Sequence, residues 1–260
     1  MKILEDLFST INLVLLLVRR DYAVQFAGTL FGFLWLLIQY TFQVAVFYVL
    51  FGVVFSGGGG HFAYDGDYFL YIMSGMMLWV PVSEMLIRSC SIIFDNRALV
   101  KRTGMGMKLF LWIPVFQGML YFFVLFSITF AIGYFRNGTG IFSPVVLIYG
   151  IIVILFFGMW AFIFSKLSLI LKDFSPIMRL LLQMVFWVTP IVYTLPEKYS
   201  AYAGMNPLFG IIEINRWLFH AKYLEPSMRT LYGLAAFIPV SIVAALIAKF
   251  RLESIALDQI

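Results

Sequence analysis

Long uncharged stretches alternate with short clusters of charged residues along the chain. The longest stretch, residues 22–64, contains no Lys, Arg, Asp or Glu and follows directly on Arg19, Arg20 and Asp21. About 20 apolar residues suffice to cross a bilayer. The pattern therefore predicts a membrane span over about 30–55, and we expect further spans to assemble around it.

Five more spans follow from the same pattern, at about 68–94, 109–135, 144–165, 180–193 and 230–249. The segment 194–229 is partly apolar, but Glu213, Arg216 and His220 interrupt it. Its apolar stretch after Asn206–Pro207 is roughly 15 residues, which is short for a crossing. We expect re-entrant helices here, which enter the outer leaflet and return within a protein or water-filled enclosure.

The distribution of Lys and Arg supports six spans with both termini on the inner side. In that topology the inner segments carry twelve of these residues and the outer segments carry five. A seventh span would place Lys249 and Arg251 outside, against the positive-inside bias. The predicted fold is an all-α integral membrane protein with a single transmembrane domain over 1–260.

Composition excludes an ordinary soluble domain. The chain is 63% hydrophobic and 12% charged, whereas soluble domains are about 25% charged. Apolar residues run continuously and do not alternate, which argues against a transmembrane β-barrel. The net charge of +5 is interpreted as membrane orientation, because no basic stripe typical of nucleic-acid binding occurs. A single cysteine, Cys90, excludes an internal disulfide.

Residues 1–28 have the pattern of an amphipathic helix that lies in the membrane interface before the first span. One helical face carries Leu4, Leu7, Phe8, Ile11 and Leu15, opposite Glu5, Ser9 and Asn12. The alternative is a cytoplasmic tail without fixed structure.

Three motifs occur in order along the chain. They are Arg20–Asp21 with 28–35 (GTLFGFLW), 172–174 (KDF) with 187–193 (WVTPIVY), and Asn206–Pro207 with Glu213 and Arg216. Together they resemble motifs of the permease subunits of ABC exporters of polysaccharides, the O-antigen, capsule and teichoic-acid group. Gln25, Phe31 and Tyr40 depart from the pattern of that family.

The resemblance implies a non-enzymatic transport subunit in the cytoplasmic (inner) membrane. It implies a homodimer with one path between two copies, two copies of a separate nucleotide-binding ATPase subunit, and a lipid-linked polysaccharide as substrate. O-antigen is the preferred polymer, with capsule or teichoic acid as alternatives. Independently, the chain contains no phosphate-binding G-x-x-x-x-G-K-[ST] loop, so ATP and Mg²⁺ are expected on the partner subunit and no cofactor on this chain.

Two groups of residues on the inner side are candidate sites. Arg97, Leu99, Lys101 and Arg102 are expected to form a short helix, and in the resembling family such a helix couples to the ATPase. The alternative is that these positive charges only orient the chain in the membrane and lie near anionic lipid. Arg19 and Arg20 suit the diphosphate of a lipid-linked sugar, because guanidinium forks match phosphate geometry. The alternative is membrane anchoring.

Within the first predicted span, one helical side combines aromatic rings with amides, which suit the apolar faces and hydroxyls of sugars. Its members are Phe31, Trp35, Gln39, Phe42 and Gln43. The alternative is helix packing, with the amides bonded to a neighbouring helix. In the second span, Glu84 and Arg88 are four residues apart and are expected to form a structural ion pair.

The resemblance also implies an outer gate after the fifth span. Its predicted residues are Trp187, Pro190, Tyr193, Asn206, Pro207, Glu213 and Arg216, with an ion pair between Glu213 and Arg216 that holds it closed. The alternative is an aromatic belt at the interface with solvent-side stabilisation.

Two other function classes stay open at this stage. A membrane-embedded lipid-phosphosugar transferase requires clustered carboxylates or histidines, and the nearest candidates, Asp65 and Asp67, have no partner in the sequence pattern. His61, His220 and Cys90 are too scattered to predict a metal site. A drug or lipid exporter of the same architecture is the other alternative.

Overall fold

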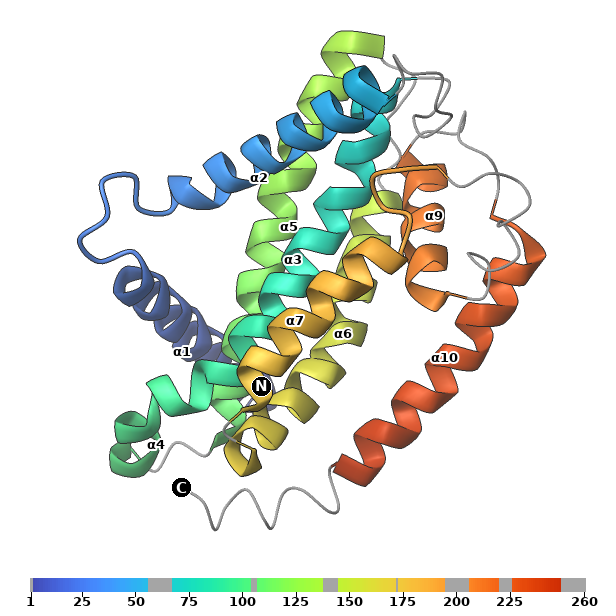
Figure 1. Ribbon diagram of the computed structural model, residues 1–260. Helices are drawn as coiled ribbons and strands as arrows, with labels where there is room; N and C mark the ends of the chain where they lie inside the picture. Colours follow the sequence, from blue (N-terminus) through green and yellow to red (C-terminus); the bar gives the residue numbers. More distant parts are fainter. Residues whose placement is uncertain are drawn as a thin grey trace.

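The structure is a computed structural model, and it describes residues 2–55, 67–103, 107–137, 145–171, 173–194, 206–219 and 226–248. Within these ranges the side chains of 2–9, 101–103, 107, 108 and 137 are not described. The described part is all-helical (Figure 1). Its elements are α1 (Lys2–Gln25), α2 (Leu34–Phe47), the π-helix η1 (Tyr48–Phe55), α3 (Tyr68–Asp95), α4 (Arg97–Thr103), α5 (Met107–Asn137), α6 (Val145–Ile170), α7 (Phe174–Val188), α9 (Pro207–Phe219) and α10 (Met228–Ile247).

Helix α3 occupies the centre of the bundle. It is buried around most of its circumference, as expected of a helix that is apolar on all sides, and it packs mainly against α5 and α6 (Figure 1). The expectation that the bundle assembles around 30–55 is wrong. Helix α2 leans across the bundle with Phe42 exposed, and the Tyr40 hydroxyl holds it to α3 by donating to the Met73 carbonyl at 3.2 Å.

Five helices in the described ranges are long and apolar enough to cross a membrane, and α7 is a shorter apolar helix. The chain is thus a multi-pass membrane protein by length and composition. The candidate spans are Leu34–Phe55, Tyr68–Asp95, Leu109–Arg136, Val145–Ile170 and Met228–Ile247. The predicted fourth span stopped at 165, whereas α6 continues to Ile170.

The predicted bounds of the fifth span are wrong at both ends. Helix α7 begins at Phe174 and ends at Val188, and Thr189 is extended with ψ 121°. The ring of a proline disfavours helical backbone angles at the preceding residue. Thr189 directly precedes Pro190, so the helix ends before it. The start was placed too late because Arg179 suggested a connecting loop, although it lies inside the helix.

Helix α1 packs against α5. Val14 and Val18 are buried there with Ile92 and Phe110. A helix within the predicted range 1–28 is confirmed over Lys2–Gln25, and its position in the membrane interface stays a prediction. The turn into α2 has Gly28 at φ 75° and Gly32 at φ 51°. Glycine adopts positive φ without steric cost, which explains its place in this turn.

Helices α5 and α6 approach closely at Gly150. The ring of Phe122, a fully buried side chain, lies directly over this glycine, and an added Cβ would lie 2.0 Å from Phe122 Cζ. Small residues allow such close packing between membrane helices.

We expect Gly150→Ala to destabilise the protein by about 1–3 kcal/mol, because overpacking a close-packed core displaces side chains and backbone. Gly158→Ala is the matched control, since its Cβ would meet Val115 Cγ2 at 3.3 Å and should cost less. Thermal unfolding in detergent, followed by tryptophan fluorescence, measures both variants. Equal midpoints for the two variants would contradict the Phe122 contact.

Candidate functional site

A groove of about 340 Å³ lies between α2, α3 and α7. We call it the central groove. Its lining consists of Gln43, Phe47, Met76, Trp79, Val80, Ser83, Glu84, Ile87, Arg179, Leu182, Gln183, Phe186 and Trp187. The groove therefore combines a charged pair, amides, a hydroxyl and large aromatic rings, which is the composition of a ligand site and not of a dry core.

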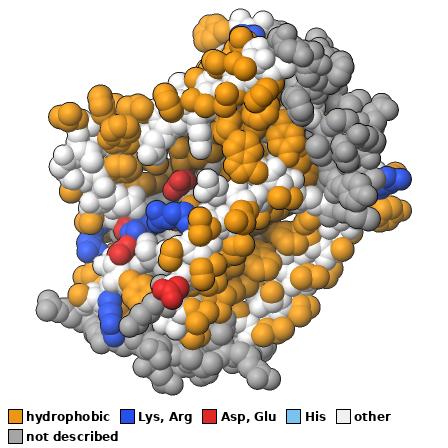
Figure 2. All heavy atoms as spheres, in the orientation of Figure 1, with side chains coloured by type: hydrophobic (Ala, Val, Ile, Leu, Met, Phe, Trp, Pro, Cys, Tyr) orange, Lys and Arg blue, Asp and Glu red, His pale blue; other side chains and the backbone are white. Residues whose placement is uncertain are grey.

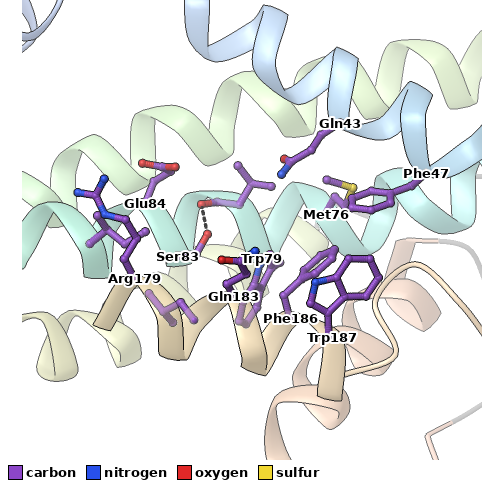
Figure 3. Close-up of a pocket in the computed structure, with 13 residues that line it drawn as sticks. Gln43, Phe47, Met76, Trp79, Ser83, Glu84, Arg179, Gln183, Phe186 and Trp187 are labelled. Carbon is purple, nitrogen blue, oxygen red and sulfur yellow. Dashed lines mark hydrogen bonds between the residues drawn. The ribbon is translucent and has the colours of Figure 1, made fainter. Parts of the chain in front are cut away.

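The lining changes in character along the central groove (Figure 3). Glu84 and Arg179 lie near one another at one end, and Ser83, Gln183 and Gln43 lie in the middle. Met76, Phe47, Phe186 and Trp187 lie at the other end. Because α3 begins at Tyr68 and ends at Asp95, the charged end is the one nearer α4.

The aromatic end is a packed cluster. Phe186 lies 5.3 Å from both Phe47 and Trp187, centroid to centroid, and 6.1 Å from Trp79. Edge and tilted arrangements of this kind stabilise aromatic pairs. Trp187 keeps 46% of its surface exposed, so the cluster presents ring faces and edges to the groove.

Of the five residues predicted to line a substrate path, the structure places Gln43 in the central groove. Phe31 precedes α2 and its ring meets Trp35 edge-on at 5.6 Å. Gln39 is exposed and Phe42 is 70% exposed, away from the groove lining. Their role in a path stays a prediction.

Sequence reasoning missed the α3 and α7 sides of the groove. Trp79, Ser83 and Glu84 belong to the predicted second span, and Gln183 and Phe186 belong to the predicted fifth span. The available signal was the occurrence of polar residues inside predicted spans, since such residues face the bundle interior or a cavity.

A second polar site joins α1 to α3 and α5. The buried Asp21 carboxylate accepts from Arg88 Nη2 at 2.6 Å and Nε at 3.1 Å. It also accepts from Gln117 Nε2 at 2.8 Å and Gln25 Nε2 at 3.2 Å. We call these four residues the Asp21 cluster. A buried carboxylate with so many donors anchors α1 firmly to the bundle.

The predicted ion pair between Glu84 and Arg88 is wrong. Arg88 forms ion pairs with Asp21 and Asp95, because the buried Asp21 requires a cation and offers both oxygens in fork geometry. Glu84 lies between the central groove and a smaller cleft of about 70 Å³ that Arg88 and Gln117 also line. Figure 2 shows charged side chains gathered in a hollow of an otherwise hydrophobic face.

The predicted entrance residues separate in the structure. Arg20 Nη1 donates to Asn96 Oδ1 at 3.0 Å, and Arg19 is exposed. Asn96 follows α3, and its carbonyl accepts from Leu99 and Val100 at the start of α4. Arg20 thus connects α1 to the junction of α3 and α4, whereas Arg19 faces outward.

The predicted short helix is confirmed as α4, Arg97–Thr103. Arg97 is exposed and Leu99 is half-buried against the α1 side of the bundle. The side chains of Lys101 and Arg102 lie outside the described part of the chain. The coupling role of this helix stays a prediction.

At the other end of the bundle, Arg216 of α9 clamps the turn that follows α7. It is buried and donates to the carbonyl of Ile191 and, at 3.4 Å, to that of Pro190. It also donates to the Tyr71 hydroxyl at 2.8 Å and lies over the Tyr71 ring at 3.6 Å. Gly75 makes room for it, since an added Cβ would lie 2.8 Å from Arg216 Nη2.

The motif Asn206–Pro207 starts α9 and ties it to the same turn. Asn206 Oδ1 accepts from Leu208 N at 3.0 Å, and its Nδ2 donates to Thr189 Oγ1 at 2.9 Å. Asn as the helix cap and Pro in the first helical position are both favoured there. Tyr68 adds a hydrogen bond to the Val192 carbonyl. The turn and the start of α9 are therefore held as one unit.

Most predicted gate residues thus meet around the turn at residues 189–193, but the predicted ion pair between Glu213 and Arg216 is wrong. Glu213 Oε2 accepts from Thr230 Oγ1 of α10 at 3.0 Å, and the described ion pairs do not join Glu213 to Arg216. Arg216 points to the carbonyls of the turn instead. Trp187 lies in the central groove, and the Tyr193 hydroxyl donates to the Trp187 carbonyl at 2.6 Å.

Burial raises the pKa of the Glu213 carboxyl, although the Thr230 hydrogen bond and the Arg216 charge oppose this effect. The folded state therefore binds more protons than the unfolded state between the ordinary and the raised pKa, and stability falls as pH rises through this interval. We expect Glu213→Gln to remove this part of the pH dependence. Denaturant unfolding at several pH values measures it. Asp173→Asn, at an exposed position, is the control, and an unchanged slope in Glu213→Gln would contradict the prediction.

Among the residues that the structure describes, no group of three or more His, Cys, Asp or Glu side chains is placed to hold a metal ion. His61 and His220 lie outside these ranges. Cys90 is buried, and its thiol contacts the Leu86 carbonyl within its own helix.

These features define a class: a multi-pass helical membrane protein with a side groove that is charged at one end and aromatic at the other. Comparison with known proteins narrows it. No family model matches the chain. It is similar to the O-antigen export system permease protein RfbA of Klebsiella pneumoniae, with 24% identity over 243 residues that cover 87% of this chain and 91% of the relative.

The protein of the same name from Myxococcus xanthus is 23% identical over 262 residues, which cover 97% of this chain and 96% of the relative. A second Klebsiella pneumoniae protein of that name is 23% identical over 215 residues, 80% of each chain. The chain is thus a distant homologue of O-antigen export permeases over nearly its whole length, which confirms the family resemblance drawn from its motifs.

Proposed function

We propose that this chain is the transmembrane subunit of an ATP-driven exporter that moves lipid-linked polysaccharide, with O-antigen as the preferred polymer, across the cytoplasmic membrane. Two copies form the path between them, and two copies of a separate ATPase subunit bind on the cytoplasmic side. Both termini lie on that side. The chain crosses the membrane six times, the short helix α7 is the fifth crossing, and α9 is re-entrant between the fifth and sixth crossings.

The central groove carries this proposal. It lies on membrane helices, and its Trp79, Phe186 and Trp187 rings offer apolar platforms for sugar rings, while Gln43 and Gln183 offer donors and acceptors for hydroxyl groups. In a dimer that joins two such grooves, these residues line the path. The full-length similarity to O-antigen export permeases supports the same assignment.

The inner side fits the ATP-coupled part of the proposal. Helix α4 projects from the end of α3 (Figure 1), and Arg20 joins α1 to the same junction. A partner that moves α4 therefore acts directly on α3, which forms one wall of the groove. Arg19 is an exposed cation on α1 close to this junction, where it can bind a diphosphate headgroup.

The outer side fits a gate. The clamp of Arg216 on the turn at residues 189–193 closes the end of α7 that carries the aromatic cluster. Release of this turn would free the end of α7 to move away from α3, and the outer end of the path would widen.

Export by proteoliposomes that contain this chain and its co-purified ATPase subunit tests the function. With ATP, a polyprenyl-diphosphate-linked glycan should cross the membrane, and Trp79→Ala with Phe186→Ala should lower its rate by about tenfold or more, because two sugar platforms are lost. Trp112→Ala, an exposed ring outside the groove, is the control. If the double variant exports at the wild-type rate, the groove does not line the path. If the wild-type complex shows no ATP-dependent export, the proposed function is wrong.

A further inference from the structure

The central groove carries no excess of either charge. Among its lining residues, all within the described part of the chain, Glu84 is the one acid and Arg179 the one base. They lie near one another at the same end (Figure 3). Their charges therefore offset each other, and the middle and far parts of the groove present uncharged groups.

Two other arginines of the bundle, Arg88 of α3 and Arg216 of α9, are engaged outside the groove. Arg88 is held by Asp21 and Asp95 on the side of α3 that faces α1. Arg216 is buried against the carbonyls of the turn after α7. Neither lines the groove, so neither supplies a cation to a ligand within it.

A polyanionic polymer requires compensating positive charge along a path through the membrane. Charge is costly in this low-dielectric region unless it is paired, and pores for anions and phosphates are lined by rings of Arg or Lys. The middle of the groove instead offers the amides of Gln43 and Gln183, which both donate and accept hydrogen bonds. The Ser83 hydroxyl donates to the Val80 carbonyl at 2.9 Å, and its oxygen remains an acceptor. Sugar hydroxyls have the same dual character as the amides.

We propose that the central groove selects for uncharged glycan and discriminates against a polymer with an acidic group in each repeat. Glu84 and Arg179 set this selectivity at the inner end: the carboxylate repels an anionic repeat, and the guanidinium keeps the local charge close to zero. This inference rests on the proposed export function and specifies its substrate class.

The test uses the same proteoliposomes with two matched substrates. Both carry the same polyprenyl diphosphate and the same number of sugars, but one consists of neutral hexoses and the other has one hexose of each repeat replaced by its uronic acid. The readout is the rate at which glycan becomes protected from an added glycosidase. We expect the neutral substrate to cross at least about tenfold faster.

Two charge variants sharpen the test because they shift the groove in opposite directions. Glu84→Gln should raise the rate for the acidic substrate relative to the neutral one, and Arg179→Gln should lower this ratio further. Arg229→Gln changes an exposed charge outside the groove and should leave the ratio unchanged.

Equal wild-type rates for the two substrates, or a ratio that moves the same way in both variants, would overturn this inference and leave the export function standing. If neither substrate crosses in the wild-type complex, the export function itself fails and the inference fails with it.

Discussion

Replacement of Arg216 by alanine is expected to destabilise the protein by about 3–5 kcal/mol, one of the two largest effects that the structure predicts. The variant leaves the carbonyls of Ile191 and Pro190 and the Tyr71 hydroxyl without their buried donor. It also removes the contact of the guanidinium with the Tyr71 ring. Thermal unfolding in detergent micelles, followed by tryptophan fluorescence, measures the loss.

Arg216→Lys should fall between the wild type and the alanine variant, because an ammonium group retains the charge but not the planar fork. Arg229→Gln, at an exposed position, should change stability by less than about 0.5 kcal/mol. If Arg216→Ala unfolds at the wild-type temperature, the contacts of Arg216 with the turn contribute nothing to stability. The proposed gate would then lack the interaction that is expected to hold it closed.

The second large effect is expected for Asp21→Asn, at about 2–4 kcal/mol, since removal of one partner leaves a cation without its buried counter-charge. The expected destabilisation is smaller than that for a fully buried ion pair, because Arg88 is 19% exposed and keeps its ion pair with Asp95. The same unfolding measurement applies. Limited proteolysis within α1 should also accelerate, because the Asp21 cluster anchors this helix to α3 and α5.

Asp95→Asn is the matched control for this pair. Asp95 is 48% exposed, and exposed ion pairs contribute about 0–1 kcal/mol, so the loss should be small. The double variant Asp21→Asn with Arg88→Gln should cost less than the sum of the two single variants, because both charges are removed together. Strict additivity would show that the contact does not stabilise the fold.

The sequence predicted the helical class, the membrane character and most span bounds, because these depend on local apolar runs. The position of each helix in the bundle did not follow from such runs. The segment 30–55 lies within the longest uncharged stretch, 22–64, but at the periphery of the bundle, whereas α3 is central. What distinguishes α3 is its burial around most of its circumference, and this burial depends on the helices that pack against it, mainly α5 and α6.

The candidate site shows the same division. The motifs around Pro190, Asn206 and Arg216 predicted a cluster that the structure assembles, since each residue has a local reason for its place, such as the helix cap at Asn206. Pairs of charges four or three residues apart were assigned to each other, and both assignments were wrong. Arg88 and Arg216 instead bond with groups distant in sequence, Asp21 and Ile191, and sequence spacing carries no information about such partners.

Gly75 and Arg216 occupy one shared volume, since a Cβ on residue 75 would also lie 3.2 Å from the Ile191 carbonyl oxygen. A larger residue at 75 is compatible with this packing only if a shorter side chain replaces Arg216. The two positions, 141 residues apart in number, are thus expected to covary among descendants of a common ancestor: glycine persists wherever the guanidinium does, and the loss of one permits the loss of the other.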